Sequence, residues 1–149
     1  MSDITIIYGT DATEMTHTLL RETAVDRRLV PGMNVVIKPN LVVAKPAAEG
    51  ATTHPEIVEG IILFLKDCGI KNPGIAEGSW LGETTDRPFD RCGFTALAKR
   101  YGVKLFDTKS DNVIKKTAHE LTLGVCETIA NADFLINVPV LKCVEKDET

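Results

Sequence analysis

Short runs of β-branched and other apolar residues alternate along this chain with longer segments in which apolar residues recur every three or four positions. The short runs are typical of strands, and the longer spacing is typical of helices that bury one face. The runs predict strands at residues 4–8, 33–37, 74–77, 103–106 and 134–138, with a short edge strand at 121–123. The longer spacing predicts helices at residues 12–28, 54–68, 89–101 and 125–130.

Polar stretches and helix-start signals separate these elements. Thr53 stands ahead of Pro55 and Glu56, an order that favours a helix start with the threonine hydroxyl as its cap. Residues 40–53 and 108–116 are polar and lack either periodicity, so both are predicted to be loops. The first of them is long for a plain connector, which is a feature of functional loops.

The alternation of apolar strands with helices defines the expected fold class. It predicts an α/β fold in which a mostly parallel sheet carries helices on both faces, a Rossmann-like three-layer sandwich. The 149 residues are enough for one domain and too few for two ordinary ones. We therefore expect a single α/β domain over residues 1–149.

Composition and charge narrow the classes of partner. Lys and Arg number 17 against 21 Asp and Glu, which gives a net charge of −4, and aromatic residues make up 5% of the chain. Nucleic-acid binding, which needs concentrated positive charge and stacking side chains, is therefore not expected. No apolar stretch approaches the length of a membrane span, and the first residues have no signal-peptide pattern. These features predict a cytoplasmic protein without a membrane partner.

Four cysteines, Cys68, Cys92, Cys126 and Cys143, are widely spaced and form no Cys-x-x-Cys pair. In a reducing compartment this spacing predicts free thiols rather than ligands of a cluster. Neither an iron–sulfur cluster nor a metal site is expected in this chain.

Candidate binding residues follow the predicted strands. Lys38 and Asn40 come at the end of the second strand, and Asn137 and Lys142 come at the end of the last. Because ligands of parallel sheets bind beyond the carboxyl ends of the strands, we expect these groups at one edge of the sheet. Two lysines there would suit a carboxylate or a phosphate. The alternative is that Lys38 is a solvated residue that merely ends a strand.

Four further residues extend the candidate site. Thr53 and His54 lie at a predicted helix N-terminus, where free N–H groups favour anions, and Glu77 and Ser79 follow the third strand. We assign proton transfer to Lys38, His54 and Glu77, and binding to Thr53 and Ser79 with the remaining groups. The alternatives stay open: a plain cap at Thr53, an exposed His54, and a turn in which Glu77 pairs with a nearby lysine.

Several common catalytic signatures are absent from the sequence. It contains no G-x-G-x-x-G after the first predicted strand, no G-x-x-x-x-G-K-[ST] and no G-x-S-x-G. A standard dinucleotide site, a P-loop nucleotidase and an α/β-hydrolase are therefore not expected.

Two motifs resemble those of the family known as domain of unknown function 362. Residues 35–42 read V-V-I-K-P-N-L-V and are followed by T-T-H-P-E, and residues 133–142 read D-F-L-I-N-V-P-V-L-K. Glu77-Gly78-Ser79 resembles the third-strand tip of the family. The resemblance covers about residue 3 to Lys142.

The resemblance implies an α/β fold and leaves the function open. Some family members carry ferredoxin-like cysteine clusters, which this sequence lacks. The family pattern continues past the final lysine, so we expect a truncated product, a fragment or a short variant. An unfinished sheet exposes apolar surface, which predicts a homo-oligomer.

Two functions compete at this point. The first is binding of a small anionic molecule by Lys38, Asn40, Asn137 and Lys142, with His54 or Glu77 moving protons if the protein is an enzyme. The second is a non-catalytic binding module or a subunit of an iron–sulfur redox assembly.

Overall fold

The computed structural model describes residues 4–142, whose centre is a four-stranded sheet. The strand order is β3-β2-β1-β6, and every neighbouring pair is parallel. The strands are β1 (Val35–Pro39), β2 (Gly74–Glu77), β3 (Lys104–Asp107) and β6 (Phe134–Val138). The predicted α/β class with a mostly parallel sheet is confirmed.

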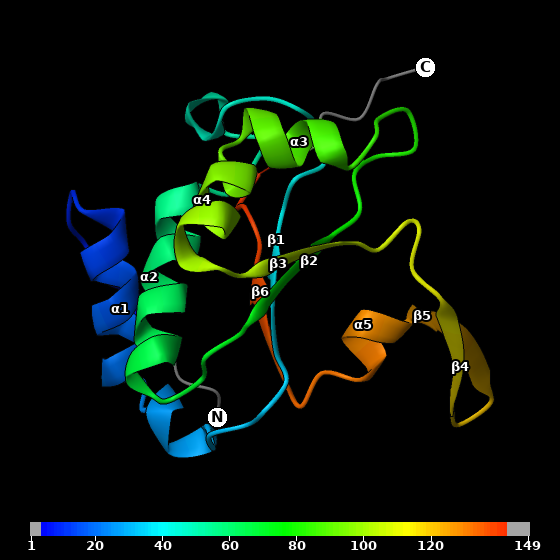
Figure 1. Ribbon diagram of the computed structural model, residues 1–149, viewed down its shortest axis with the longest axis horizontal. Coiled ribbons are helices and arrows are strands. Elements are labelled where there is room, and N and C mark those ends of the chain that lie inside the picture. The colour runs from blue at the N-terminus through cyan, green and yellow to red at the C-terminus, as the bar shows by residue number, and fades with distance from the viewer. Residues whose placement is uncertain (1–3, 143–149) are drawn as a thin grey trace.

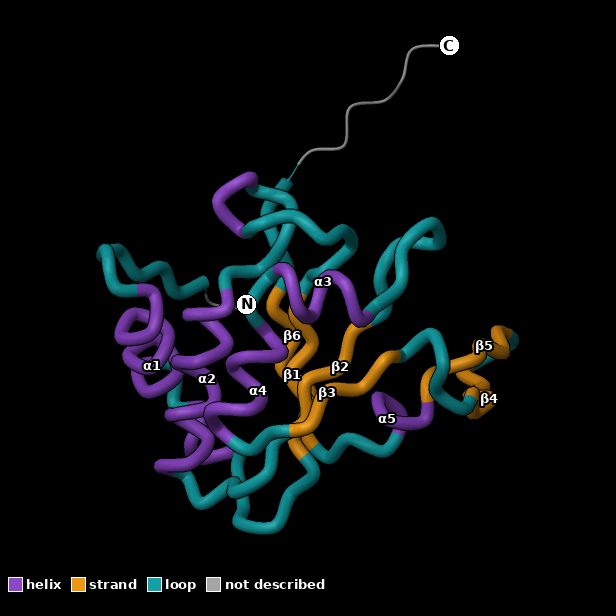
Figure 2. The backbone as a smooth tube through the Cα atoms, turned by 45° about the horizontal axis from the view of Figure 1, so that its top comes forward, coloured by secondary structure: helices purple, strands orange, loops and turns teal. Residues whose placement is uncertain are grey.

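Helices lie on both sides of the sheet and beyond its carboxyl end. Helices α1 (Ala12–Glu22), α2 (Pro55–Asp67) and α4 (Phe94–Tyr101) are together on one side, and the single turn α5 (Glu127–Ala130) is on the other (Figures 1 and 2). Helix α3 (Asp86–Arg91) lies above the carboxyl ends of the strands in Figure 1. Two 3₁₀ segments, Val25–Arg28 and Ala47–Glu49, complete the helical elements of residues 4–142.

The core lies between the sheet and α2 with α4. Side chains of the two inner strands, such as Val35, Ile37 and Ile75, are fully buried against residues of α2 such as Phe64 and Leu65. The inner strands read as continuous apolar runs because helices and neighbouring strands shield them from water. This packing holds the carboxyl ends of β1 and β2 at fixed positions.

A hairpin of β4 (Val113–Ala118) and β5 (Leu121–Cys126) stands apart from the main sheet (Figures 1 and 2). Two expectations were wrong here. Residues 108–116 are not entirely a loop, because β4 begins at Val113, and residues 121–123 pair with β4 rather than with the main sheet. Both faces of this ribbon are largely exposed, and only Ile114, Val125 and Cys126 are half-buried.

The first predicted strand and the length of the first helix were also wrong. Residues 4–8 form no strand, and Ile4 and Tyr8 are 87% and 88% exposed. A run with β propensity becomes a strand only where another strand takes its backbone hydrogen bonds. Helix α1 ends at Glu22 because the Thr23 hydroxyl donates to the carbonyl of Leu19 and Ala24 adopts a left-handed φ of 54°.

Within residues 4–142, no helix combines the length and the apolar composition needed to cross a bilayer.

The contact between α1 and α2 depends on Gly60. A Cβ atom placed there would lie 2.5 Å from the backbone oxygen of Thr13 and 2.8 Å from the Cβ atom of Thr16. No side chain other than hydrogen therefore fits at this crossing without moving α1.

We predict that Gly60→Ala destabilises the protein although alanine is the better helix former. The gain in helix propensity is about 1 kcal/mol, whereas overpacking against a backbone atom costs about 1–3 kcal/mol. A net loss of about 1 kcal/mol in the free energy of unfolding is expected in urea denaturation. A gain in stability would contradict the close approach of the two helices.

Candidate functional site

Lys38 and Glu77 meet at the carboxyl end of the sheet. They come from the neighbouring inner strands β1 and β2, and the Nζ atom of Lys38 lies 3.0 Å from Oε2 of Glu77. The Glu77 side chain is 5% exposed, whereas that of Lys38 is 37% exposed. The other oxygen of Glu77, Oε1, accepts a hydrogen bond from the backbone N–H of Gly78 at 2.8 Å. The buried carboxylate is therefore satisfied on both oxygens, and its charge is balanced by a lysine that still reaches water.

Asn137 lies beside Lys38 on the other flank. The two residues are register partners on β1 and β6, so their Cα atoms lie about 4.8 Å apart and their side chains leave the sheet on the same face. Asn137 is exposed. Three neighbouring strands thus contribute Glu77, Lys38 and Asn137 to one edge, as the topology argument predicts.

Thr53 joins three segments and is not the helix cap that the sequence predicts. Its Oγ1 accepts from the backbone N–H of Asn40 at 2.8 Å and donates to the carbonyl of Val138 at 2.8 Å. The residue that precedes α2 as its N-cap is His54, whose side chain makes no capping bond. The cap prediction fails because Thr53 is 2% exposed and its hydroxyl is already bonded to Asn40, just after β1, and to Val138 of β6. Thr53 and Asn40 therefore build the edge of the sheet.

The remaining predicted residues have structural partners of their own. His54 is exposed, with Nδ1 3.8 Å from Oε2 of Glu56. The hydroxyl of Ser79 donates to the carbonyl of Glu83 at 2.9 Å, and Nζ of Lys142 donates to the carbonyl of Ala51 at 3.0 Å. The geometry therefore pairs Lys38 with Glu77 and places Asn137 on the strand beside Lys38. Ser79 and Lys142 bond carbonyls of loops instead, and His54 is exposed.

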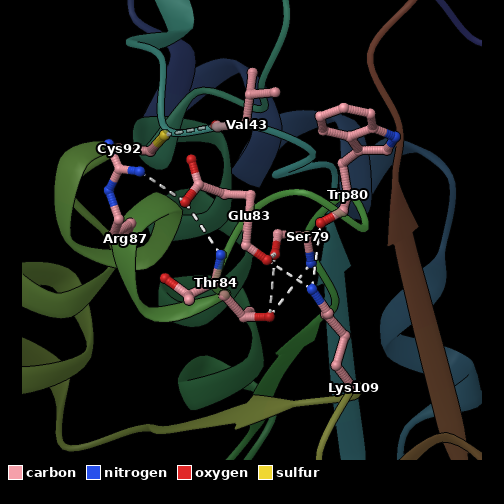
Figure 3. Close-up of polar contacts among 9 residues, drawn as sticks. Val43, Ser79, Trp80, Glu83, Thr84, Arg87, Cys92 and Lys109 are labelled. Atoms are coloured by element: carbon pink, nitrogen blue, oxygen red, sulfur yellow. Dashed lines mark hydrogen bonds and ion pairs between the residues drawn. The ribbon is translucent and has the colours of Figure 1, made fainter.

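The sequence interpretation missed Thr85 and Lys109, which organise the loops around the end of β3. Oδ1 of Asp107, the register partner of Glu77, accepts from the Thr85 hydroxyl at 2.6 Å and from the backbone N–H of Lys109 at 2.9 Å. Nζ of Lys109 donates to the carbonyls of Trp80 at 3.2 Å and Glu83 at 2.6 Å (Figure 3). Thr85 precedes Asp86 and Pro88, which is a helix-start signal; nothing in the sequence marks Lys109.

Cys92 supports the loop after β1 rather than acting as a nucleophile. Its thiol donates to the carbonyl of Lys45 at 3.1 Å, and burial raises its pKa above that of a free thiol. A raised pKa keeps the sulfur protonated and poorly reactive at neutral pH. Cys68, Cys92 and Cys126 are free thiols, whereas Cys143 lies outside the described residues.

No three His, Cys, Asp or Glu side chains among residues 4–142 gather closely enough to hold a metal ion.

An apolar groove of about 360 Å³ lies between α1, α2 and β6, lined by residues such as Met15, Leu19, Ile61 and Ile136, with Asn137 at its border. Its lining has almost no polar groups, so it is distinct in character from the charged edge.

The fold and the site together define the class of protein. It is a parallel α/β protein with an ion pair at the carboxyl ends of its inner strands. Residues 35–146 match the family model described as Domain of unknown function (DUF362), and the chain belongs to this family. All eight predicted site residues fall inside the matched span. Comparison with curated proteins and with solved structures gives no match.

We predict that Thr53→Val destabilises the protein by about 2 kcal/mol. Valine keeps the shape of threonine but leaves the partly buried Asn40 N–H and Val138 carbonyl without this partner, and a buried group of this kind costs about 1–3 kcal/mol. The matched control is Thr84→Val at an exposed position, where we expect a change within about 0.5 kcal/mol. Equal effects of the two substitutions in urea denaturation would contradict the role assigned to Thr53.

Proposed function

We propose that this protein binds a small anionic molecule, a carboxylate or a phosphate, at the carboxyl ends of β1, β2 and β6. The observation that carries the proposal is the half-exposed Lys38 held against the buried Glu77. A lysine ammonium has three N–H donors, and the hydrogen bond to Glu77 uses one of them. The other donors are available to oxygens of a ligand that approaches from water.

The position of Lys38 favours binding of the anion by directed hydrogen bonds over attraction by net positive charge. Because Glu77 neutralises the pair, the ligand gains directed, charge-assisted hydrogen bonds from Lys38 rather than a net positive field. The Asn137 amide on the neighbouring strand adds a donor on the same face. Glu77 fixes the lysine before the ligand arrives, which lowers the entropy cost of binding.

Binding without turnover is the form of the proposal that the contacts favour. Thr53, Ser79 and Lys142 are engaged in bonds that shape the loops, and His54 lies beside Glu56. A catalytic form would use Lys38 and Glu77 for proton transfer, since they already share a hydrogen bond, with His54 as a further acid or base.

The test is a calorimetric titration of the protein with acetate and with inorganic phosphate. Lys38→Met removes the ammonium and keeps the side-chain length, and we expect the affinity for the bound anion to fall by about 10-fold to 100-fold. Lys104→Met is the matched control, because Lys104 is an exposed lysine at the opposite end of the strands. Absence of binding by any anion, or equal losses in both variants, would refute the proposal.

Glu77→Gln separates binding from catalysis. The substitution removes the negative charge beside Lys38 and keeps a hydrogen-bond acceptor, so we expect tighter anion binding, by about 3-fold or more. A catalytic Glu77 would instead show lost turnover in the same variant. Weaker anion binding in Glu77→Gln would contradict this expectation, and would mean that the positioning of Lys38 by Glu77 outweighs the repulsion between Glu77 and the anion.

We also propose that the chain associates with copies of itself. In the hairpin, Ala118 pairs with Leu121 and Ile114 pairs with Val125, and Leu121 and Leu123 are 61% and 54% exposed on the same face. Lys116, the register partner of Leu123, is the one charged residue on this face. An isolated two-stranded ribbon is marginal in water, so this largely apolar face favours contact with another surface. Sedimentation should show a dimer or larger species that Leu123→Lys shifts towards monomer; a monomer at high concentration would refute self-association.

A further inference from the structure

The loop after β2 presents a tryptophan to water. Trp80, the single tryptophan of the chain, is 65% exposed, and it follows the buried Glu77 by three residues. Three residues span at most about 11 Å, so the Cα atom of Trp80 lies no farther than that from the Cα atom of Glu77. The loop that carries the aromatic side chain therefore begins at the buried carboxylate of the Lys38–Glu77 pair.

The backbone of this loop is fixed rather than loose. Lys109 donates to the carbonyls of Trp80 and Glu83, and the Ser79 hydroxyl donates to the same Glu83 carbonyl (Figure 3). The N–H of Glu83 in turn bonds the carbonyl of Trp80 at 2.9 Å. Lys109 thus binds two carbonyls of the same loop and holds the backbone of Trp80 in place.

A second bond ties Trp80 to the loop after β1. Its backbone N–H donates to the carbonyl of Val42 at 3.0 Å. The loops after β1 and β2 begin just beyond Lys38 and Glu77. Trp80 therefore sits where these two loops meet, above the strand ends that carry the pair.

Gly82 sets the orientation of the ring. A Cβ atom at Gly82 would lie 2.7 Å from Cζ3 and 3.1 Å from Cε3 of Trp80. The indole therefore rests on the glycine backbone, and a side chain at residue 82 would displace it. The rest of the ring remains open to water, although loop and glycine hold it in place.

We propose that Trp80 forms an aromatic wall of the anion site and selects carboxylates or phosphates that are attached to a planar aromatic ring. This inference rests on the proposed function, since Lys38 binds the anionic group. Aromatic rings stack with an offset or edge to face, and such pairs add stabilisation beyond the burial of area. Ligand sites commonly combine an apolar aromatic surface with a few fixed polar groups, as here.

The test compares ligands that differ only by the ring. Benzoate is titrated against acetate, and phenyl phosphate against inorganic phosphate, with calorimetry and with the fluorescence of the single tryptophan. We expect the aromatic anion to bind at least about fivefold more tightly than its plain counterpart and to change the tryptophan emission. Benzyl alcohol, which has the ring without the charge, should bind at least tenfold more weakly than benzoate.

Variants assign the preference to the ring. Trp80→Leu should abolish the preference, so that benzoate and acetate bind with equal affinity in calorimetry. Trp80→Phe should keep most of the preference, which controls for folding defects. Leu81→Ala, at a neighbouring residue that is 92% exposed, should behave like the unaltered protein.

The outcomes separate this inference from the proposed function. Lys38-dependent binding of acetate and benzoate with equal affinity would overturn the role of Trp80 and leave the anion site intact. Benzoate binding that survives Lys38→Met unchanged would overturn it also, because the ring would then bind away from the anion. No binding of any of the four anions would remove both proposals.

Discussion

A single buried carboxylate constrains the carboxyl end of this sheet. Glu77 ends an inner strand whose side chains are all buried, and an unpaired carboxylate there would cost several kcal/mol, or would have to be protonated. Lys38 on the adjacent strand meets this requirement at 3.0 Å. The pair is satisfied only if β1 and β2 keep their register, so the ion pair and the strand alignment specify each other. Such pairs add little net stability, but loss of one partner is costly.

Polar bonds of the same kind assemble the loops around this pair. Thr53 joins the ends of β1 and β6, Cys92 holds the loop after β1, and Lys109 closes the loop after β2. Each bond connects segments that are far apart in the sequence, so the edge forms only when the whole domain folds. The result is a preorganised surface in which the partly exposed Lys38 and the exposed Asn137 remain available to a ligand.

The alternation of apolar runs and helical spacing was enough to predict the parallel α/β fold, because both signals arise from burial. The rule that strand ends share one edge was enough to bring Lys38, Glu77 and Asn137 together. The alternative in which Glu77 pairs with a nearby lysine is the arrangement observed, and the lysine is Lys38 itself. The anionic ligand and the proton-transfer roles of Lys38, His54 and Glu77 stay predictions.

Expectations that rested on local signals alone were the ones that failed. Thr53 matches a helix-start pattern, but its hydroxyl bonds Val138, 85 positions away, and no local rule includes such a partner. Residues 4–8 have strong β propensity and no strand beside them to pair with. The contacts of Lys109 with Trp80 and Glu83 cross 29 and 26 positions. Tertiary hydrogen bonds of this kind form between residues that only the folded chain brings together. The residue types at neighbouring positions in the sequence therefore do not predict them.

A double-mutant cycle at Lys38 and Glu77 tests the central claim most directly. The free energy of unfolding in urea is measured for the unaltered protein, Lys38→Met, Glu77→Gln and the double variant. Because Lys38 is partly exposed, water screens the pair, and we expect a coupling free energy of about 1–2 kcal/mol, with Glu77→Gln less harmful once Lys38 is absent. Additive effects within about 0.3 kcal/mol would contradict an ion pair that fixes the carboxyl end of the sheet.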